Sequence, residues 1–270
     1  LLRSLPYERE RRITREMLSM SIQYYGLPRC MILAGLNFTC ATLATRTRKL
    51  LELQVKESAE KHRIESELNV ATQIQTSMLP TAFPEREEID LFASMSPARE
   101  VGGDFYDFFM VDDRHLAIVM ADVSGKGVPA ALFMVIGKTL IKDHTNPDRD
   151  LGEVFSRVND LLCESNSEGL FITAFEGVLD LVTGEFNFVN AGHEMPMISR
   201  GGKAFEAHKI RPGFVLAGME GVRYRRFDLQ LQPGDTLYLY TDGVTEATDA
   251  AQTLYGEARL QALLNRHHGA

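Results

Sequence analysis

The pattern of apolar and polar positions divides the chain into a helical first part and a mixed remainder. Residues 6–25 are rich in Arg and Glu, and their apolar residues recur at helical spacing, which predicts one buried stripe of Ile13, Met17, Met20 and Tyr24. The Gly-Leu-Pro at residues 26–28 predicts a break. A second helix is expected over residues 31–46, and it leads into a charged helical segment over residues 49–78.

The charged segment over residues 49–78 carries an approximate heptad seam of Ile64, Leu68, Ala71, Gln75 and Met78. Glu57 and Lys61 weaken this seam further upstream. Two interpretations stay open: a coiled-coil dimer, and a single amphipathic helix packed on the following domain. In either case we expect a helical regulatory or dimerisation segment over residues 1–48 and a long linker helix over residues 49–80.

Strand-like runs replace the helical pattern after residue 80. Pro80 and Pro84 end the helix, because proline interrupts helical hydrogen bonding. Short apolar runs then alternate with Gly or Asp turns, and they predict strands over residues 91–95, 105–111, 116–121, 171–179, 185–190, 196–199, 224–231 and 236–240. Helices are predicted over residues 128–143 and 151–164. This order favours an α+β fold, with sheets covered by helices, over repeating βαβ units.

Composition narrows the class of protein. The formal net charge of −8 disfavours a protein that tracks nucleic-acid phosphates. The three cysteines, Cys30, Cys40 and Cys163, are widely spaced, so we expect no disulfide framework or zinc site and a reducing, cytoplasmic compartment. The apolar run over residues 31–44 is short and polar for a membrane span, although a longer parent chain with a membrane tether is compatible with the sequence. Because the chain begins with Leu1, we expect a fragment or a processed product.

Three short acidic motifs, over residues 102–107, 121–127 and 240–246, carry the candidate chemistry. In each motif an aspartate stands near glycine at the edge of an apolar run: Asp104, Asp122 and Asp242. Carboxylates placed in this way can reach a hard divalent cation such as Mg²⁺ or Mn²⁺, which prefers oxygen ligands. A lone Asp-Gly usually marks a turn. The three motifs together predict a metal-dependent hydrolase.

With the segments between them, these motifs make the chain resemble the type-2C (PPM) metal-dependent protein phosphatases, in their bacterial SpoIIE/RsbU-like branch. The resemblance covers residues 67–264 in order and spacing. Besides the acidic motifs it rests on Ala-Thr-Gln-Ile-Gln-Thr-Ser-Met-Leu-Pro at 71–80, Gly-Lys-Gly-Val-Pro-Ala-Ala-Leu at 125–132, Phe-Ile-Thr-Ala-Phe at 171–175, Asn-Ala-Gly-His at 190–193 and Gly-Asp at 234–235.

The resemblance implies an α/β/β/α sandwich of two antiparallel sheets flanked by helices, behind the helical N-terminal segment. It also implies a site for two Mn²⁺ or Mg²⁺ ions, in which Asp122 bridges the metals and the Val123 carbonyl is a second ligand. Asp242 then binds one metal, and Asp104 holds metal-bound water or contributes directly. The implied reaction is attack of water on a phosphoserine or phosphothreonine monoester, without a phosphoenzyme intermediate.

One departure from the family pattern concerns the end of the chain. Members of this branch carry a further metal-binding Asp in an Asp-Asp-x-Thr segment, and the sequence reaches Ala270 without one. We therefore expect residues 81–270 to be a phosphatase domain truncated at its C-terminus. A degenerate, catalytically inactive phosphoprotein-binding or dimeric scaffold is the alternative.

Partners follow from the same resemblance. It implies a phosphoprotein substrate, namely an anti-sigma-factor antagonist with a STAS fold in bacterial partner-switching signalling and stress response. An upstream sensor and a homodimer formed through residues 1–80 are expected, and no nucleic acid is. Three further residues have open roles: His193 as a proton donor or a turn residue, Lys126 as a phosphate contact or an exposed lysine, and Asp107 as metal support or a loop cap.

Overall fold

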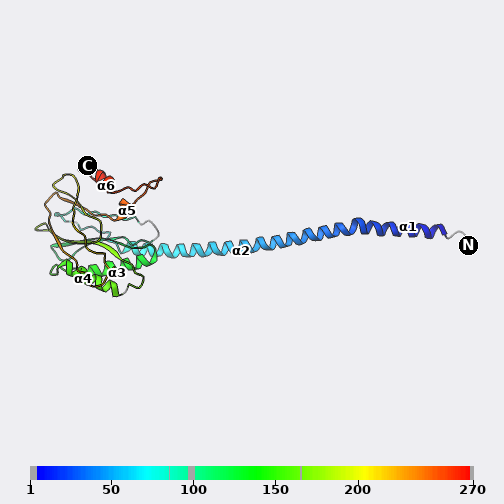
Figure 1. Ribbon diagram of the computed structural model, residues 1–270, viewed down its shortest axis with the longest axis horizontal. Coiled ribbons are helices and arrows are strands. Elements are labelled where there is room, and N and C mark those ends of the chain that lie inside the picture. Colours follow the sequence, from blue (N-terminus) through cyan, green and yellow to red (C-terminus); the bar gives the residue numbers. More distant parts are fainter. Residues whose placement is uncertain (1–4, 85, 97–100, 165, 268–270) are drawn as a thin grey trace. The chain divides into compact units, whose positions relative to one another are not determined.

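The computed structural model describes residues 5–84, 86–96, 101–164 and 166–267. The chain separates into two compact units, Leu1–Ser66 and Glu67–Ala270. Figure 1 traces the elements from the N-terminal helices in blue to the last helix in red.

The N-terminal segment is helical, as the sequence predicted. Its elements are α1 (Leu5–Ser21), a π-helical turn (Ile22–Gly26) and α2 (Leu27–Ser77). The break predicted at residues 26–28 is therefore a change of helical type, with one wide turn before α2 begins. Pro28 is the second residue of α2, and because proline has no backbone N–H it interrupts the regular helical hydrogen bonding next to this turn.

The apolar stripe predicted on the first helix is not buried. Ile13 is 49% and Met17 68% exposed, because the described part of this unit contains only helix and offers no second layer to pack against. The helical run Arg9–Met78 also contains an 18-residue window that is long and apolar enough to cross a membrane, and no part of that window is buried. Length and composition alone are weak evidence for a span.

The larger sheet has five strands in the order β1-β2-β3-β4-β7, and every neighbouring pair is antiparallel. The strands are β1 (Phe105–Met110), β2 (His115–Val123), β3 (Ile172–Asp180), β4 (Glu185–Ala191) and β7 (Phe227–Gln230). The smaller sheet has the order β6-β5-β8, with β5 (Met197–Ser199), β6 (Glu206–Ala207) and β8 (Thr236–Tyr238), and is also antiparallel.

Three apolar clusters join these sheets and the helices into four layers. Helices α3 (Val128–His144) and α4 (Leu151–Glu164) cover the five-stranded sheet through the largest cluster, which includes Phe155 and Val119. Phe175 and Phe186 pack towards Leu237 between the sheets. On the far side, Leu260 of α6 (Glu257–His267) packs on Met197 of β5. Figure 1 shows α3 and α4 on one side of the sheets and α6 on the other. This is the α/β/β/α sandwich that the resemblance implied.

One predicted strand is wrong. Residues 91–95 form no strand, and the nearest pairing is an isolated bridge between Arg86 and Ile89. The run alternates as a strand should, yet a strand forms only against a partner, and the described residues provide none here. Phe92 accordingly stays 84% exposed. The other predicted strands and both predicted helices are present, with ends that differ by a few residues.

Candidate active site

The three candidate aspartates come from segments that the two sheets bring towards one end. Asp122 is the penultimate residue of β2, and Asp104 immediately precedes β1. Because β1 and β2 are antiparallel, with Phe105 opposite Ala121, the beginning of one lies beside the end of the other. Asp242 begins the short helix α5 (Asp242–Thr245), which follows β8 of the smaller sheet.

Contacts and charge interactions link the aspartates to one another. The Thr241 hydroxyl donates a hydrogen bond of 2.7 Å to Oδ2 of Asp104, so the loop before α5 is tied to the start of β1. Burial raises the pKa of Asp122 to about 8, and a hydrogen bond with Asp104 and the charges of Asp104 and Asp242 add to this rise. The structure therefore brings all three within electrostatic reach.

Val123, whose carbonyl is the fourth predicted ligand, ends β2 beneath the Asp104 loop. A Cβ atom built on Gly103 would lie 2.6 Å from the Val123 carbonyl oxygen. Only glycine therefore permits this close approach of the two backbones. The glycine pair before Asp104 is thus needed to place the loop directly on the end of β2.

The surroundings of the aspartates are strongly negative. Burial and the charges of Glu246 and Asp104 raise the pKa of Asp242, and the exposed Lys126 offsets this only in part. Burial raises the pKa of Glu194 as well, with Glu257, Asp242 and Glu246 adding to the shift. Within the described part of the chain, no Lys, Arg or His makes an ion pair with Asp104, Asp122 or Asp242.

An all-oxygen set with excess negative charge matches the donors that Mg²⁺ and Mn²⁺ prefer. The set is not drawn together around one point, however. Among the residues that the structure describes, no group of three or more His, Cys, Asp or Glu side chains is close enough to hold an ion. The donor chemistry fits divalent cations, and the ligand roles of Asp104, Asp122, Val123 and Asp242 stay predictions.

His193 belongs to the framework beside the site. Its backbone N–H donates to the Asn190 side chain at 2.8 Å, and the Asn190 amide donates to the His193 carbonyl at 3.0 Å. Its Nδ1 lies 3.0 Å from the hydroxyl of Thr173, the residue opposite Asp122 in the sheet. Burial lowers the pKa of His193 to about 4, so the ring is neutral at pH 7. These contacts favour the turn role of the Asn-Ala-Gly-His motif.

Asp107 is separated from the other aspartates by its partners. It is 3% exposed and makes ion pairs with Lys138, which donates a hydrogen bond to it, and with Lys142 at 3.7 Å. Its other oxygen accepts a hydrogen bond of 2.9 Å from the backbone N–H of Phe108. Its carboxylate is thus satisfied within the protein, which argues against metal support.

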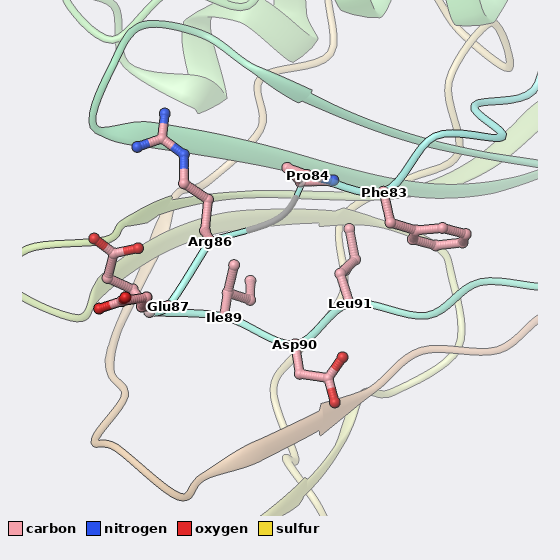
Figure 2. A pocket seen from close by; sticks show the side chains of 8 residues that line it. Phe83, Pro84, Arg86, Glu87, Ile89, Asp90 and Leu91 are labelled. Carbon is pink, nitrogen blue, oxygen red and sulfur yellow. The ribbon is translucent and has the colours of Figure 1, made fainter.

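A surface depression of about 840 Å³ lies elsewhere in the domain. It is lined by residues 83–84 and 86–91, with Phe83, Arg86 and Asp90 among them. Figure 2 shows the charged side chains of Arg86, Glu87 and Asp90 around it. None of the candidate aspartates lines this depression, so the candidate chemistry does not belong to it.

Two residues of the sequence motifs make contacts beside the site that were not predicted, and one of them, Gln75, was expected only on the heptad seam. Thr241 stands in the third acidic motif and bonds to Asp104. Gln75 stands in the motif over residues 71–80 and bonds to the backbone of Gly102. Their positions in the motifs were visible in the sequence, whereas these contacts across 137 and 27 residues were not.

The layered fold and the aspartates at the ends of its strands define a domain of the PP2C-type phosphatase class. Residues 112–270 match the family of Stage II sporulation protein E (SpoIIE), and this chain belongs to that family. Phosphoserine phosphatase RsbU of Bacillus subtilis is 32% identical over 184 residues, which cover 68% of this chain and 54% of RsbU. Protein IcfG of Synechocystis sp. is 29% identical over 255 residues, 84% of this chain and 39% of IcfG.

Solved structures agree in fold. The SiaA-PP2C domain of Pseudomonas aeruginosa has a TM-score of 0.63 at 23% identity and covers 78% of this chain and 85% of that domain. The PP2C phosphatase domain of SpoIIE from Bacillus subtilis was solved with a fragment of its regulatory domain. It has a TM-score of 0.53 at 19% identity, and the match covers 61% of this chain and 47% of that chain. This chain spans about half or less of the length of the curated relatives that it matches.

Proposed function

We propose that this chain carries a serine/threonine protein phosphatase domain that hydrolyses a phosphoserine or phosphothreonine monoester with the help of two Mn²⁺ or Mg²⁺ ions. One observation supports this most: Asp104, Asp122 and Asp242 lie within electrostatic reach of one another, and no Lys, Arg or His of the described residues pairs with them. The likeness to RsbU, a phosphoserine phosphatase, supports the same reaction.

The residues have distinct tasks in this proposal. Asp122, the Val123 carbonyl and Asp242 would hold the ions, and Asp104 would join them or hold water in place. Bound divalent cations supply neutralisation of the phosphate and activation of water at neutral pH. Thr241 orients the Asp104 carboxylate through its hydrogen bond. His193, neutral and 5% exposed, supports the framework rather than transferring a proton.

For the substrate, we propose a phosphoserine-bearing STAS protein of the anti-sigma-factor antagonist type. The support is the membership of the SpoIIE family together with the likeness to RsbU. The net charge of −8 is consistent with a protein substrate and gives no reason to expect nucleic acid.

The N-terminal helices are proposed to dimerise and to respond to an upstream sensor, in the cytoplasm or next to a membrane. Ile64 is 46% exposed and Leu68 is half-buried on the predicted heptad seam of α2. Replacing both by Glu should disrupt a dimer, because like charges would face each other across the seam. Analytical ultracentrifugation measures this, and an unchanged oligomeric state would contradict the dimer.

The scaffold is the second candidate, and one observation favours it: the described acidic side chains are not gathered closely enough to hold an ion. The experiment that separates the two is Mn²⁺-dependent release of phosphate from a phosphoserine STAS protein, with calorimetry of Mn²⁺ binding. We expect binding and hydrolysis that are both lost in Asp122→Asn. Substrate binding without any Mn²⁺ binding would favour the scaffold.

A further inference from the structure

Gln75, in the last turns of α2, has a buried side chain, whereas the residues on either side of it in the helix are exposed. It is 5% exposed, whereas Gln73, two residues earlier, is exposed. A buried amide is unfavourable unless its donor and acceptor are both satisfied. The partners of Gln75 therefore explain why a glutamine is buried here.

Both partners belong to one residue, Gly102. The Gln75 Nε2 group donates to the Gly102 carbonyl at 2.7 Å, and the Gly102 N–H donates to Gln75 Oε1 at 3.1 Å. Two backbones in an antiparallel pair exchange the same pair of hydrogen bonds. It fixes the orientation of the Gly102 backbone as well as its position.

Gly102 begins the loop that presents Asp104. The next residue, Gly103, lies so close to Val123 that an added Cβ atom would be 2.6 Å from the Val123 carbonyl oxygen. The loop is therefore held on one side by the side chain of Gln75 and on the other by the end of β2. Asp104 is the next residue, so the position of the loop determines where its backbone lies.

The same end of α2 also contacts the chain after Asp104. The Tyr106 hydroxyl donates a hydrogen bond of 3.4 Å to the Pro80 carbonyl, and Leu79 is 6% exposed in the main core cluster. The segment over residues 75–80 thus contacts β1 and its preceding loop on both sides of Asp104. All these residues lie within the unit Glu67–Ala270.

We propose that Gln75 is a positioning residue of the metal site, which couples the end of α2 to the Asp104 loop. Loss of the Gln75 contacts would free Gly102 to shift, and the Asp104 carboxylate with it, so these contacts would raise the affinity for the metal. The coupling through Gly102 stands on the contacts alone, and its effect on metal affinity rests on the proposed function.

Gln75→Met tests the coupling, because methionine keeps the length and loses both hydrogen bonds. Hydrogen–deuterium exchange of the Gly102 amide should become about tenfold faster, and the affinity for Mn²⁺ should fall by about tenfold in calorimetry, as expected for the loss of roughly one to two hydrogen bonds. Gln73→Met, on the exposed side of the helix, should change neither quantity. Val158→Ala, on the buried face of α4, should lower the melting temperature without weakening Mn²⁺ binding.

The outcomes separate the two proposals. Unchanged exchange at Gly102 in Gln75→Met would overturn the coupling. Faster exchange with an unchanged Mn²⁺ affinity would overturn the role of Gln75 in the site. The proposed function would still be supported if the wild-type chain binds Mn²⁺ and Asp122→Asn does not. If the wild-type chain binds no Mn²⁺, the proposed function fails, and the link to metal affinity fails with it.

Discussion

Two groups of acidic residues, an outer and an inner cluster, differ in how their charge is balanced. In the outer cluster, Asp104, Asp122 and Asp242 lie within electrostatic reach of one another and make no ion pair with the described residues. Under α3, Asp107 is paired with Lys138 and Lys142. Glu176 beside them is fully buried and accepts a hydrogen bond of 2.6 Å from the Thr145 hydroxyl.

The two clusters solve the problem of burying carboxylates in different ways. In the inner cluster the protein supplies a lysine for Asp107, and burial raises the pKa of Glu176 to about 8, so that this carboxyl is largely neutral at pH 7. In the outer cluster burial likewise raises the pKa of Asp122 to about 8, but no Lys or Arg among the described residues pairs with the three carboxyl groups, which stay partly exposed. We infer that the outer cluster gains from an external cation, whereas the inner one is complete.

Neutralising Asp122 should give the largest effect and separates the clusters most sharply. Asp122→Asn should weaken Mn²⁺ binding and metal-dependent hydrolysis by more than about 100-fold, since it removes a carboxylate that we propose as a metal ligand. The melting temperature of the metal-free variant should equal that of the wild type at pH 7 and exceed it above about pH 8, where Asp122 of the wild type loses its proton and is repelled by Asp104 and Asp242. Calorimetry and thermal melts measure both.

The matched change in the inner cluster is Asp107→Asn. It should lower the melting temperature and leave the affinity for Mn²⁺ near that of the wild type. If Asp107→Asn abolished Mn²⁺ binding while the fold stayed intact, the division between the two clusters would be wrong.

Removing the internal cation should have the next largest effect. Lys138→Met leaves the carboxylate of Asp107, 3% exposed, without its nearest partner, and should lower the free energy of unfolding by about 3 kcal/mol. Lys142→Met is the control: its side chain is half exposed and 3.7 Å from Asp107, so a loss below about 1 kcal/mol is expected. Urea denaturation compares them, and equal losses would contradict the assigned importance of Lys138.

The sequence predicted the outer cluster better than the inner one, for a physical reason. Asp104, Asp122 and Asp242 each stand near glycine at the edge of an apolar run, and this local pattern is visible without a structure. The pairing of Asp107 with Lys138 spans 31 residues and depends on how α3 crosses β1, which no local pattern records. Glu176 lies inside an apolar strand and gave no signal that it would be buried.

The same limit explains what was missed in the fold. Periodicity identified most strands and the two helices on the larger sheet, because each depends on its own alternation. Residues 91–95 have the alternation and lack a partner among the described residues, so the prediction of a strand failed there. The stripe on α1 likewise has helical spacing and no layer against which to be buried.

A pH series tests whether Glu176 is neutral. Its pKa is about 8 in the folded protein, above the ordinary value of 4.5. Between pH 4.5 and pH 8, therefore, Glu176 is protonated in the folded state and ionised in the unfolded state. The free energy of unfolding should therefore decrease as pH rises from about 5 to 8, by up to roughly 1.4 kcal/mol per pH unit. Glu176→Gln should remove this contribution.

The comparison is made between wild type and Glu176→Gln by urea denaturation across this range, because other raised groups, such as Asp122, contribute a slope of the same sign to both proteins. The Oε2 atom of Glu176 has no hydrogen-bond partner among the described residues, which fits a neutral carboxyl better than a buried charge. Parallel slopes for the two proteins would show that Glu176 is ionised throughout.

The smallest effect is expected at Thr241, whose hydroxyl donates a hydrogen bond of 2.7 Å to Asp104. Thr241→Val keeps the shape and removes this donor, so the carboxylate should be less well oriented and the affinity for Mn²⁺ should fall by about three- to tenfold, the cost of one hydrogen bond at a partly exposed site. Thr241→Ser retains the hydroxyl and should bind Mn²⁺ almost as the wild type does. If Thr241→Val and Thr241→Ser weakened binding equally, the hydroxyl would not be what orients Asp104. The position of Asp104 would then depend on its backbone loop rather than on Thr241, in contrast to Asp107 of the inner cluster, whose ion-pair partners are side chains of α3.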